Sequence, residues 1–178
     1  RTRKEFIDLI NVSQNGSALF LESLKALPQP STLTNLAETA RTAAAVWVPN
    51  RNAIFASLAA AYAESHNLDA VAFGFNSEEA QTFPDNSLDF MRSLEQTFVF
   101  STIRSIKVVS ATARLSKTQI VQKLKSLGNF PFEKIWSCYD HSSFHCGRCE
   151  SCQRLNRALQ RGLPESDFTK FSQQIFGP

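Results

Sequence analysis

The chain contains four cysteines, and all of them lie within fifteen residues of one another. They are Cys138, Cys146, Cys149 and Cys152, in the order C-x7-C-x2-C-x2-C. Four thiolates at this spacing can close a tetrahedral shell around Zn²⁺, with bonds of about 2.3 Å. Such a shell leaves no position for water, so the spacing predicts a structural zinc site rather than a catalytic one. The loop over residues 136–152 must then hold another part of the protein in place.

Three other arrangements compete with this zinc site. Two disulfides would need an oxidising compartment, and no signal-like apolar stretch opens the sequence. A ferredoxin-type iron–sulfur cluster has its fourth cysteine downstream and followed by proline, whereas here the fourth cysteine lies upstream. A zinc ribbon needs a second C-x-x-C pair about 15–20 residues away. Either His141 or His145 could replace a thiol, but beside four cysteines we expect both to be loop residues.

Length and composition indicate one globular domain over residues 1–178. Hydrophobic residues make up 43% of the chain and charged residues 20%, which is ordinary for a soluble protein. The net charge of +3 is too small to predict binding to nucleic acid or to an anionic membrane. No apolar run approaches the roughly 20 residues that span a bilayer. Reduced, clustered thiols favour a cytoplasmic location.

Short apolar runs alternate with helical patterns along the chain. The expected strands cover residues 5–10, 70–74 and 105–111, and the run at 70–74 predicts a strand buried on both faces. The expected helices cover residues 50–66, a stretch capped by Asp85 or Asn86, a stretch between the capping box at 116–119 and Gly128, and residues 149–161. Strands alternating with amphipathic helices predict an α/β fold, a parallel sheet with helices on both faces.

Apolar side chains at helical spacing predict which face of each helix meets the core. For the helix at 50–66 these are Ile54, Phe55, Leu58 and Tyr62. For the helix after Asn86 they are Phe90, Met91, Leu94 and Phe98, and for the capping-box helix Ile120, Val121, Leu124 and Leu127. The tail from Phe168 to Phe176 would suit a protein partner.

Two loops carry polar residues where ligands of α/β proteins bind. Residues 74–79 follow a predicted strand directly, and ligands bind beyond the carboxyl ends of parallel strands. Residues 48–52 precede a helix, so their amides and Arg51 could meet an anion. A solvated turn explains Glu78 and Glu79 equally well, and a single arginine such as Arg51 is more often a surface residue.

Four segments, in order, resemble one family. Residues 48–55 resemble its V-P-x-R-N-x-x-F helix start, and residues 74–85 resemble its G-x-N-x-E-D…Y-P-D loop. Residues 115–120 resemble L-S-K-A-E-I. Residues 136–139 and 145–152 are similar to its W-S-C-Y…C-G-R-C-x-x-C zinc loop. This is the 7-cyano-7-deazaguanine synthase (QueC) family of the PP-loop ATP-pyrophosphatase superfamily, and the resemblance covers roughly residues 46–160.

The resemblance implies a PP-loop fold of the adenine nucleotide alpha hydrolase type with a zinc loop near the C-terminus. It implies an ATP-dependent ligase that converts the carboxylate of 7-carboxy-7-deazaguanine to a nitrile with ammonia. ATP with Mg²⁺ would be the co-substrate, and zinc would fix a wall of the base pocket without taking part in the chemistry. A homodimer, or a complex with a protein partner, would also fit the family.

Site residues follow from the positions that match the family's motifs. Arg51 and Lys117 would lie on the phosphate side and act in catalysis. The substrate-binding candidates are Asn76, Glu78, Glu79, Phe83, Asp85, Trp136 and Tyr139. Among these, Glu78, Glu79 and Asp85 could accept the adjacent N–H donors of a deazaguanine, and the aromatic side chains could stack on the base.

The sequence departs from the family in two places. The superfamily's S-G-G-x-D-S phosphate motif is absent, and none of the six glycines are adjacent. We therefore expect this motif to lie before Arg1, and the 178 residues alone to bind ATP weakly or not at all. Residues 79–86, with the sequence E-A-Q-T-F-P-D-N, also differ from the D-Y-S-G-Y-P-D-C that the family has at this position. The alternative is thus a subunit of a bacterial defence or modification complex that binds a deazaguanine or transfers it to another acceptor.

Overall fold

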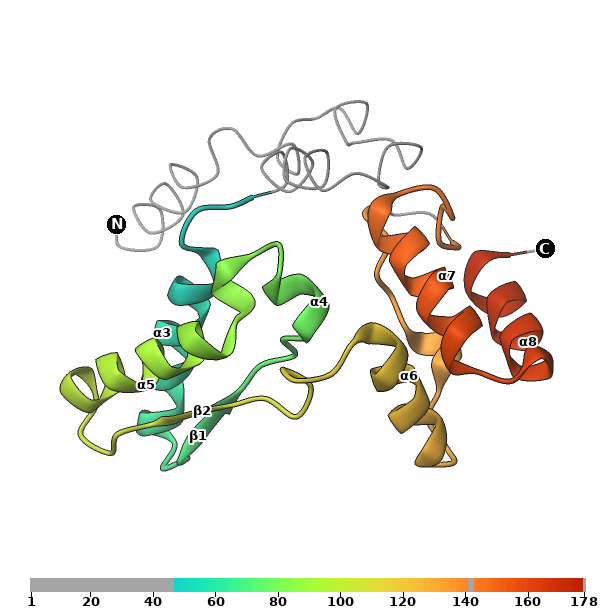
Figure 1. The fold of residues 1–178 in the computed structure, drawn as a ribbon. Coiled ribbons are helices and arrows are strands. Elements are labelled where there is room, and N and C mark those ends of the chain that lie inside the picture. The colour runs from blue at the N-terminus through green and yellow to red at the C-terminus, as the bar shows by residue number, and fades with distance from the viewer. Residues whose placement is uncertain (1–46, 141–142, 178) are drawn as a thin grey trace. The chain divides into compact units, whose positions relative to one another are not determined.

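The computed structural model describes residues 47–140 and 143–177. These residues form two compact units, which cover residues 47–114 and residues 115–177 (Figure 1). The strand predicted at residues 5–10 lies outside the described part of the chain. None of the described helices is long and apolar enough to cross a membrane.

The first unit combines helices with a pair of parallel strands. Its elements are α3 (Arg51–Ser65), β1 (Ala70–Ala72), α4 (Ser77–Ala80), the 3-10 helix η3 (Pro84–Asn86), α5 (Leu88–Ser101) and β2 (Lys107–Val109). Strands β1 and β2 pair in parallel, with Ala70 opposite Lys107. The intervening α5 provides the crossover that a parallel pair requires. The predicted α/β character and parallel strand pairing are confirmed.

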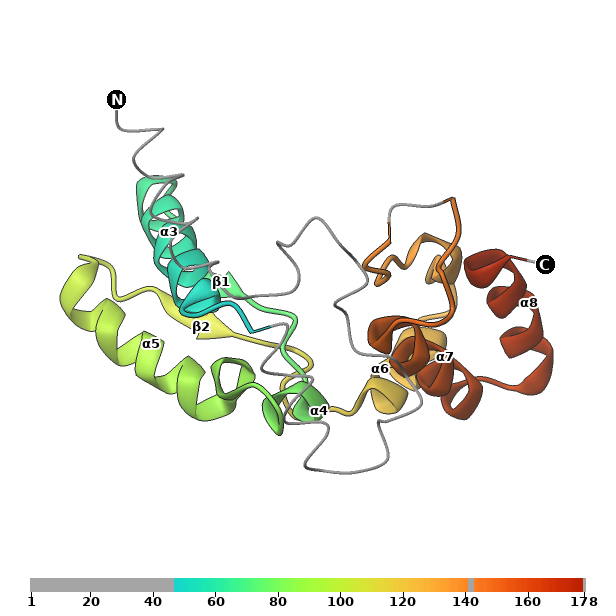
Figure 2. The same cartoon turned by 90° about the horizontal axis from the view of Figure 1, so that it is seen from above.

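One face of the strand pair carries the core of the first unit. Val71 and Val108 lie opposite each other, and both are buried against residues of α3 and α5. Both helices therefore cover the same face, as the two views show (Figures 1 and 2). Ala70 and Ala72 on β1 are exposed, so the prediction of a strand buried on both faces is wrong. Side chains alternate along a strand, and within the described residues α3 and α5 cover only the Val71 side.

Helix α3 buries a different face from the one that its large apolar residues predict. Phe55, Leu58 and Tyr62 are 55%, 47% and 61% exposed. The buried apolar residues are instead the alanines Ala56, Ala60 and Ala63. Small side chains let the helix axis approach α5 and β1 closely, and that close approach decides which face is buried. The predicted core face of this helix is wrong, although its bounds agree with the predicted 50–66 to within one residue at each end.

Helix α5 buries the face that its sequence predicts but begins at a different cap. Met91, Leu94 and Phe98 are buried, and Phe90 packs beside them. The N-cap is Ser87, whose Oγ accepts a hydrogen bond of 3.1 Å from the Phe90 N–H. The prediction of Asp85 or Asn86 as the cap is wrong because both residues belong to η3. The backbone reaches the extended conformation of an N-cap only at Ser87.

The second unit is built from helices around its own core. Its elements are α6 (Lys117–Ser126), η4 (Phe132–Lys134), α7 (Glu150–Gly162) and α8 (Glu165–Phe176). The predicted capping box opens α6: the Ser116 Oγ accepts from the Gln119 N–H at 3.2 Å, and the Gln119 Oε1 accepts from the Ser116 N–H at 2.8 Å. Gly128 follows the helix end with a φ of 82°, as a C-terminal glycine should.

The aromatic tail belongs to this second core. Residues 165–176 form α8, which lies beside α7 in both views (Figures 1 and 2). Phe168, Phe171 and Phe176 pack against buried residues of the same unit, including Phe132 and Leu159. These aromatic side chains therefore have partners within the chain, and the expectation that the tail serves a protein partner stays a prediction. On α6, Val121 is buried as predicted, whereas Leu127 is 67% exposed because it lies beyond the last turn.

Gly162 is predicted to be essential for the close approach of α6 and α7. A Cβ at this position would lie 2.7 Å from the Val121 Cγ1 and 3.1 Å from the Thr118 carbonyl oxygen. We expect Gly162→Ala to lower the free energy of unfolding by about 1–3 kcal/mol, the usual cost of overpacking. Chemical denaturation would measure it. Gly74→Ala is the control, because a Cβ there meets nothing within 4 Å. Equal stability of the two variants would contradict the prediction.

Candidate functional site

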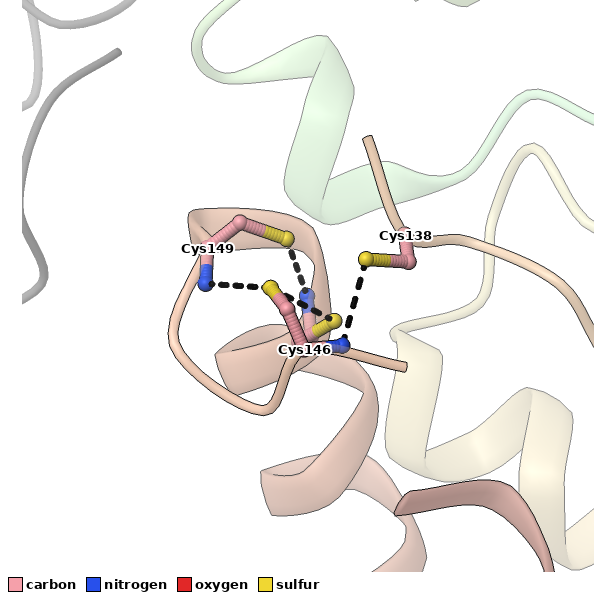
Figure 3. Close-up of side chains that lie close together, drawn as sticks. Cys138, Cys146 and Cys149 are labelled. Atoms are coloured by element: carbon pink, nitrogen blue, oxygen red, sulfur yellow. Dashed lines mark hydrogen bonds between the residues drawn. The ribbon is translucent and has the colours of Figure 1, made fainter. Parts of the chain in front are cut away.

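The four cysteines converge in the second unit. Their sulfur atoms all lie within 4.8 Å of one another, and none of the four forms a disulfide. The Sγ atoms of Cys146 and Cys152 are 3.9 Å apart. A tetrahedral zinc with bonds of about 2.3 Å separates its sulfurs by about 3.8 Å. The cluster therefore fits a four-thiolate metal site, with the sulfurs of Cys138, Cys146 and Cys149 turned toward one another (Figure 3).

Backbone N–H groups point at these sulfurs and hold the loop in shape. Cys138 Sγ accepts hydrogen bonds from the N–H groups of Asp140 and Cys146, both at 3.3 Å. Cys146 Sγ accepts from the Cys149 N–H at 3.4 Å, and Cys149 Sγ accepts from the Cys152 N–H at 3.4 Å. Such donors stabilise thiolates over thiols. The loop is thus arranged for negatively charged sulfur.

Helix α7 and one glycine position the last three cysteines. Cys149 is the N-cap of α7, and its sulfur occupies the place of the usual capping oxygen. Cys152 lies one turn into the helix and is fully buried. Gly147 has a φ of 69°, a backbone conformation that glycine adopts without strain, and it forms the turn between Cys146 and Cys149.

The burial of the sulfurs opposes the charge that their donors favour. Burial raises the pKa of the Cys138 and Cys152 thiols. Burial also opposes ionisation of Cys146, but hydrogen bonds from the backbone N–H groups of Cys149 and Arg148, together with those from the Cys138 and Cys149 side chains, lower the pKa of Cys146 to about 7. Four thiolates this close repel one another, so a bound cation is what would let all four ionise. The donor set, all sulfur, matches a soft or borderline metal.

His145 is a residue of the cysteine loop that joins its two arms. Only 4% of His145 is exposed, and its Nε2 accepts a hydrogen bond of 3.0 Å from the Ser137 N–H. Burial lowers the pKa of His145, and the carbonyl of Ile175 offsets part of that effect. The ring also packs against Trp136, with centroids 4.6 Å apart. His145 is therefore a supporting residue of the loop and does not belong to the group of four sulfurs, while His141 lies outside the described residues.

In the first unit, α4 carries two of the predicted substrate residues, and a third forms its N-cap. Asn76 is buried and caps α4, since its Oδ1 accepts from the Glu79 N–H at 3.0 Å. Glu78 and Glu79 occupy the first turn of α4 and are half-buried. The side-chain oxygen of Asn76 is therefore already used by the fold. The two carboxylates lie just beyond the end of β1, where the sequence places them.

Two segments that resemble the family meet in space near η3. The Asn52 side chain, in the first turn of α3, donates to the carbonyl oxygen of Asp85 at 3.2 Å. Burial raises the pKa of Asp85, an effect that a hydrogen bond from Asn86 and the charge of Arg51 only partly offset. The Asp85 carboxylate is not a helix cap, since Ser87 has that role. Arg51 on α3 and the carboxylates of α4 thus lie on two helices that both contact η3, which carries Asp85.

Two residues near these sites were missed by sequence reasoning. Trp47 stacks on Phe83 with ring planes 8° apart and centroids at 6.0 Å, so it shares the aromatic surface predicted for Phe83 alone. Glu150 is buried in the first turn of α7 and pairs with Arg154. No motif marks Trp47. The i, i+4 spacing of Glu150 and Arg154 was the only available signal for that pair.

The remaining predicted site residues lie in the second unit. Trp136 is 51% exposed and Tyr139 is half-buried, and both belong to the cysteine loop. Lys117 occupies the first turn of α6. The structure therefore groups Arg51, Asn76, Glu78, Glu79, Phe83 and Asp85 in one unit, and Lys117, Trp136, Tyr139 and the four cysteines in the other.

Comparison with known proteins gives one consistent result. The family model described as queuosine biosynthesis protein QueC matches residues 3–162. A 7-cyano-7-deazaguanine synthase of Desulforamulus reducens is 43% identical over 90% of this chain and 72% of its own length. The synthase of Pelotomaculum thermopropionicum is 39% identical over 90% of this chain and 73% of its own length. That of Bdellovibrio bacteriovorus is 45% identical over 82% of this chain, but the match covers only 63% of its own length.

Proposed function

This chain belongs to the QueC family, and from that membership we propose that it acts as an ATP-dependent ligase. The reaction converts the carboxylate of 7-carboxy-7-deazaguanine, with ammonia, to the nitrile 7-cyano-7-deazaguanine. The observation that carries this proposal is the 43% identity, over 90% of the chain, to a protein named 7-cyano-7-deazaguanine synthase. A cytoplasmic location and a homodimer are parts of the same proposal, and light scattering would test the second.

The chemistry requires the carboxylate to be activated twice. A carboxylate is a poor electrophile at neutral pH, because oxide would have to leave. Transfer of AMP from ATP to a carboxylate oxygen releases pyrophosphate and creates a good leaving group. Ammonia then attacks the carbonyl carbon and displaces AMP, which gives the amide. A second transfer of AMP to the amide oxygen allows that oxygen to depart with AMP, and loss of the nitrogen's protons leaves the nitrile.

The base would be held by the carboxylates of the first unit. A deazaguanine presents two adjacent N–H donors, which one carboxylate can accept in a bidentate pair. Glu78, Glu79 and Asp85 are the candidates. Support comes from their position in α4 and η3, two elements that contact each other directly after β1. Phe83 with Trp47 would supply an aromatic surface for the base within the same unit.

The metal would be a structural Zn²⁺ held by Cys138, Cys146, Cys149 and Cys152. The sulfur separations and the N–H groups aimed at the sulfurs support this assignment. All four ligand positions would belong to the protein, so the metal would stabilise the loop that carries Trp136 and Tyr139. Asn76 would act indirectly, by fixing the start of α4.

Mass spectrometry of the reaction mixture tests the proposal. The full-length protein would be incubated with 7-carboxy-7-deazaguanine, ATP, Mg²⁺ and ammonium, with ATP or ammonium omitted as controls. The nitrile is expected only in the complete mixture. No nitrile in the complete mixture would contradict the proposal. A deazaguanine found attached to another acceptor would support a subunit that binds or transfers the base instead.

Arg51→Ala is expected to lower turnover by about 10–100-fold, the loss of one or two charge-assisted hydrogen bonds to a phosphate. Arg51 is our candidate in the first unit for the phosphate side of the bound nucleotide. Because Arg51 is exposed, the substitution should leave the melting temperature unchanged. Arg92→Ala is the matched control, since Arg92 is also exposed and its ion pair with Asp89 lies at the surface. Equal turnover of the two variants would remove Arg51 from the site.

A further inference from the structure

The end of the chain lies against the cysteine loop. The backbone N–H of His145 donates to the carbonyl oxygen of Ile175 at 3.0 Å. Ile175 belongs to the last turn of α8, where carbonyl groups have no partner within the helix. The bond therefore satisfies a helix end and fixes the residue before Cys146. The ring of Phe176 also meets the His145 ring edge-on, with centroids 5.5 Å apart.

A second contact joins the same two segments. A Cβ at Gly177 would lie 3.3 Å from the Phe144 ring, so the backbone at the end of α8 passes directly over this side chain. Phe144 and His145 immediately precede the metal-ligand candidate Cys146. Side chains and backbone thus both join α8 to this arm of the loop.

The side chain of His145 also joins the two arms of the loop. Its Nε2 accepts from the N–H of Ser137, eight residues away. A backbone N–H can only donate, so Nε2 carries no proton and the neutral ring holds its proton on Nδ1. Ser137 precedes Cys138, just as His145 precedes Cys146. This hydrogen bond therefore joins the two arms of the loop next to two of the four sulfurs, beside the bond from the Cys146 N–H to the Cys138 Sγ.

We propose that His145 is a positioning residue through which helix α8 holds the metal loop closed. In this arrangement the ring of Phe176 and the carbonyl of Ile175 fix His145, and His145 fixes Ser137 and the adjacent Cys138. Undocking the end of α8 frees the imidazole, which loosens the first arm of the loop and opens the metal shell. The inference rests on the proposed zinc site and adds a device that retains the metal.

Zinc release from the full-length protein tests this device. The rate of metal transfer to a chromogenic chelator would be measured for Phe176→Leu and for His145→Phe. Phe168→Leu is the matched control, because Phe168 packs on the same core from α8, whereas the ring contact with His145 is made by Phe176. Substitution of a residue that supports a metal ligand typically weakens metal affinity by about 10–100-fold. We expect both test variants to release zinc at least about tenfold faster than Phe168→Leu.

Two further measurements separate positioning from general stability. Co²⁺-substituted protein should show altered visible bands in His145→Phe but not in Phe168→Leu, because the bands report the geometry of the sulfur shell. His145→Gln offers a carbonyl oxygen to the Ser137 N–H, so it should recover part of the metal retention that His145→Phe loses. Melting curves would be recorded for every variant.

Each outcome decides between the proposals. Release from Phe176→Leu and His145→Phe no faster than from Phe168→Leu would overturn the inference while leaving the metal site intact. A wild-type protein that binds no zinc would overturn both. If Phe176→Leu fails to fold, the test uses His145→Phe and His145→Gln instead. Zinc release at the same rate from these two variants and from the wild type would overturn the inference.

Discussion

Cys149→Ser is expected to lose its bound zinc and to unfold residues 115–177. The serine hydroxyl can replace the sulfur as N-cap of α7, so the start of the helix keeps its cap while the metal shell loses a ligand. Structural zinc contributes about 10–16 kcal/mol in small metal-dependent folds. That is as large as the whole stability of a typical domain, about 5–15 kcal/mol. Losing the metal should therefore cost the fold of the unit, not only its activity.

Metal analysis and circular dichroism would measure this effect. The wild type should be colourless and carry about one zinc per chain, as a four-thiolate site requires. Ser151→Ala is the control, since Ser151 lies between two ligands without being one, and it should keep both metal and fold. A folded, zinc-loaded Cys149→Ser protein would show that Cys149 is not a ligand. A brown wild type would instead indicate an iron–sulfur cluster.

Asp85→Asn is expected to weaken binding of 7-carboxy-7-deazaguanine by about 10–100-fold. A hydrogen bond to a charged group contributes about 1.5–3 kcal/mol, and each 1.4 kcal/mol is a factor of ten in affinity. Asparagine keeps the size of the side chain but replaces one acceptor oxygen with a donor. Calorimetric titration with the base would measure the loss. Glu78→Gln and Glu79→Gln extend the same test to α4.

Asp85→Asn should keep the stability of the parent protein, because burial shifts the pKa of Asp85. Burial raises that pKa in the folded state above its unfolded value. The stability contribution of Asp85 is therefore fully present below the unfolded pKa and is lost as pH rises through the folded pKa. Asparagine stays neutral, so Asp85→Asn should melt no lower than the parent at neutral pH.

A matched variant separates the binding effect from a general loss of negative charge. Asp89→Asn removes a carboxylate from an exposed side chain at the start of α5, where it pairs with Arg92. It should leave base affinity unchanged. If Asp85→Asn and Asp89→Asn bind the base equally well, Asp85 does not recognise it. A marked drop in the melting temperature of Asp85→Asn would mean that its role is structural.

Local sequence determined the features whose causes are local. The spacing of Cys146, Cys149 and Cys152 fits one turn of the chain followed by the start of a helix. Their clustering could therefore be predicted from the local sequence, without knowledge of tertiary contacts. The capping box at Ser116 and the stop at Gly128 satisfy backbone groups within a few residues. The face of α5 with Met91, Leu94 and Phe98 was predictable, because its large apolar residues all fall on one side.

Contacts between distant segments decided the rest. The alanine face of α3 is buried because close approach to α5 and β1 favours small side chains, a constraint that periodicity does not contain. Ser87 rather than Asp85 caps α5, because η3 holds Asp85 beside Asn52, 33 residues away. The tail folds back as α8 because Phe171 and Phe176 find partners in Phe132 and His145. Sequence thus determined which groups could bind a metal or a base, and tertiary packing decided which of them stay available and what holds them in place.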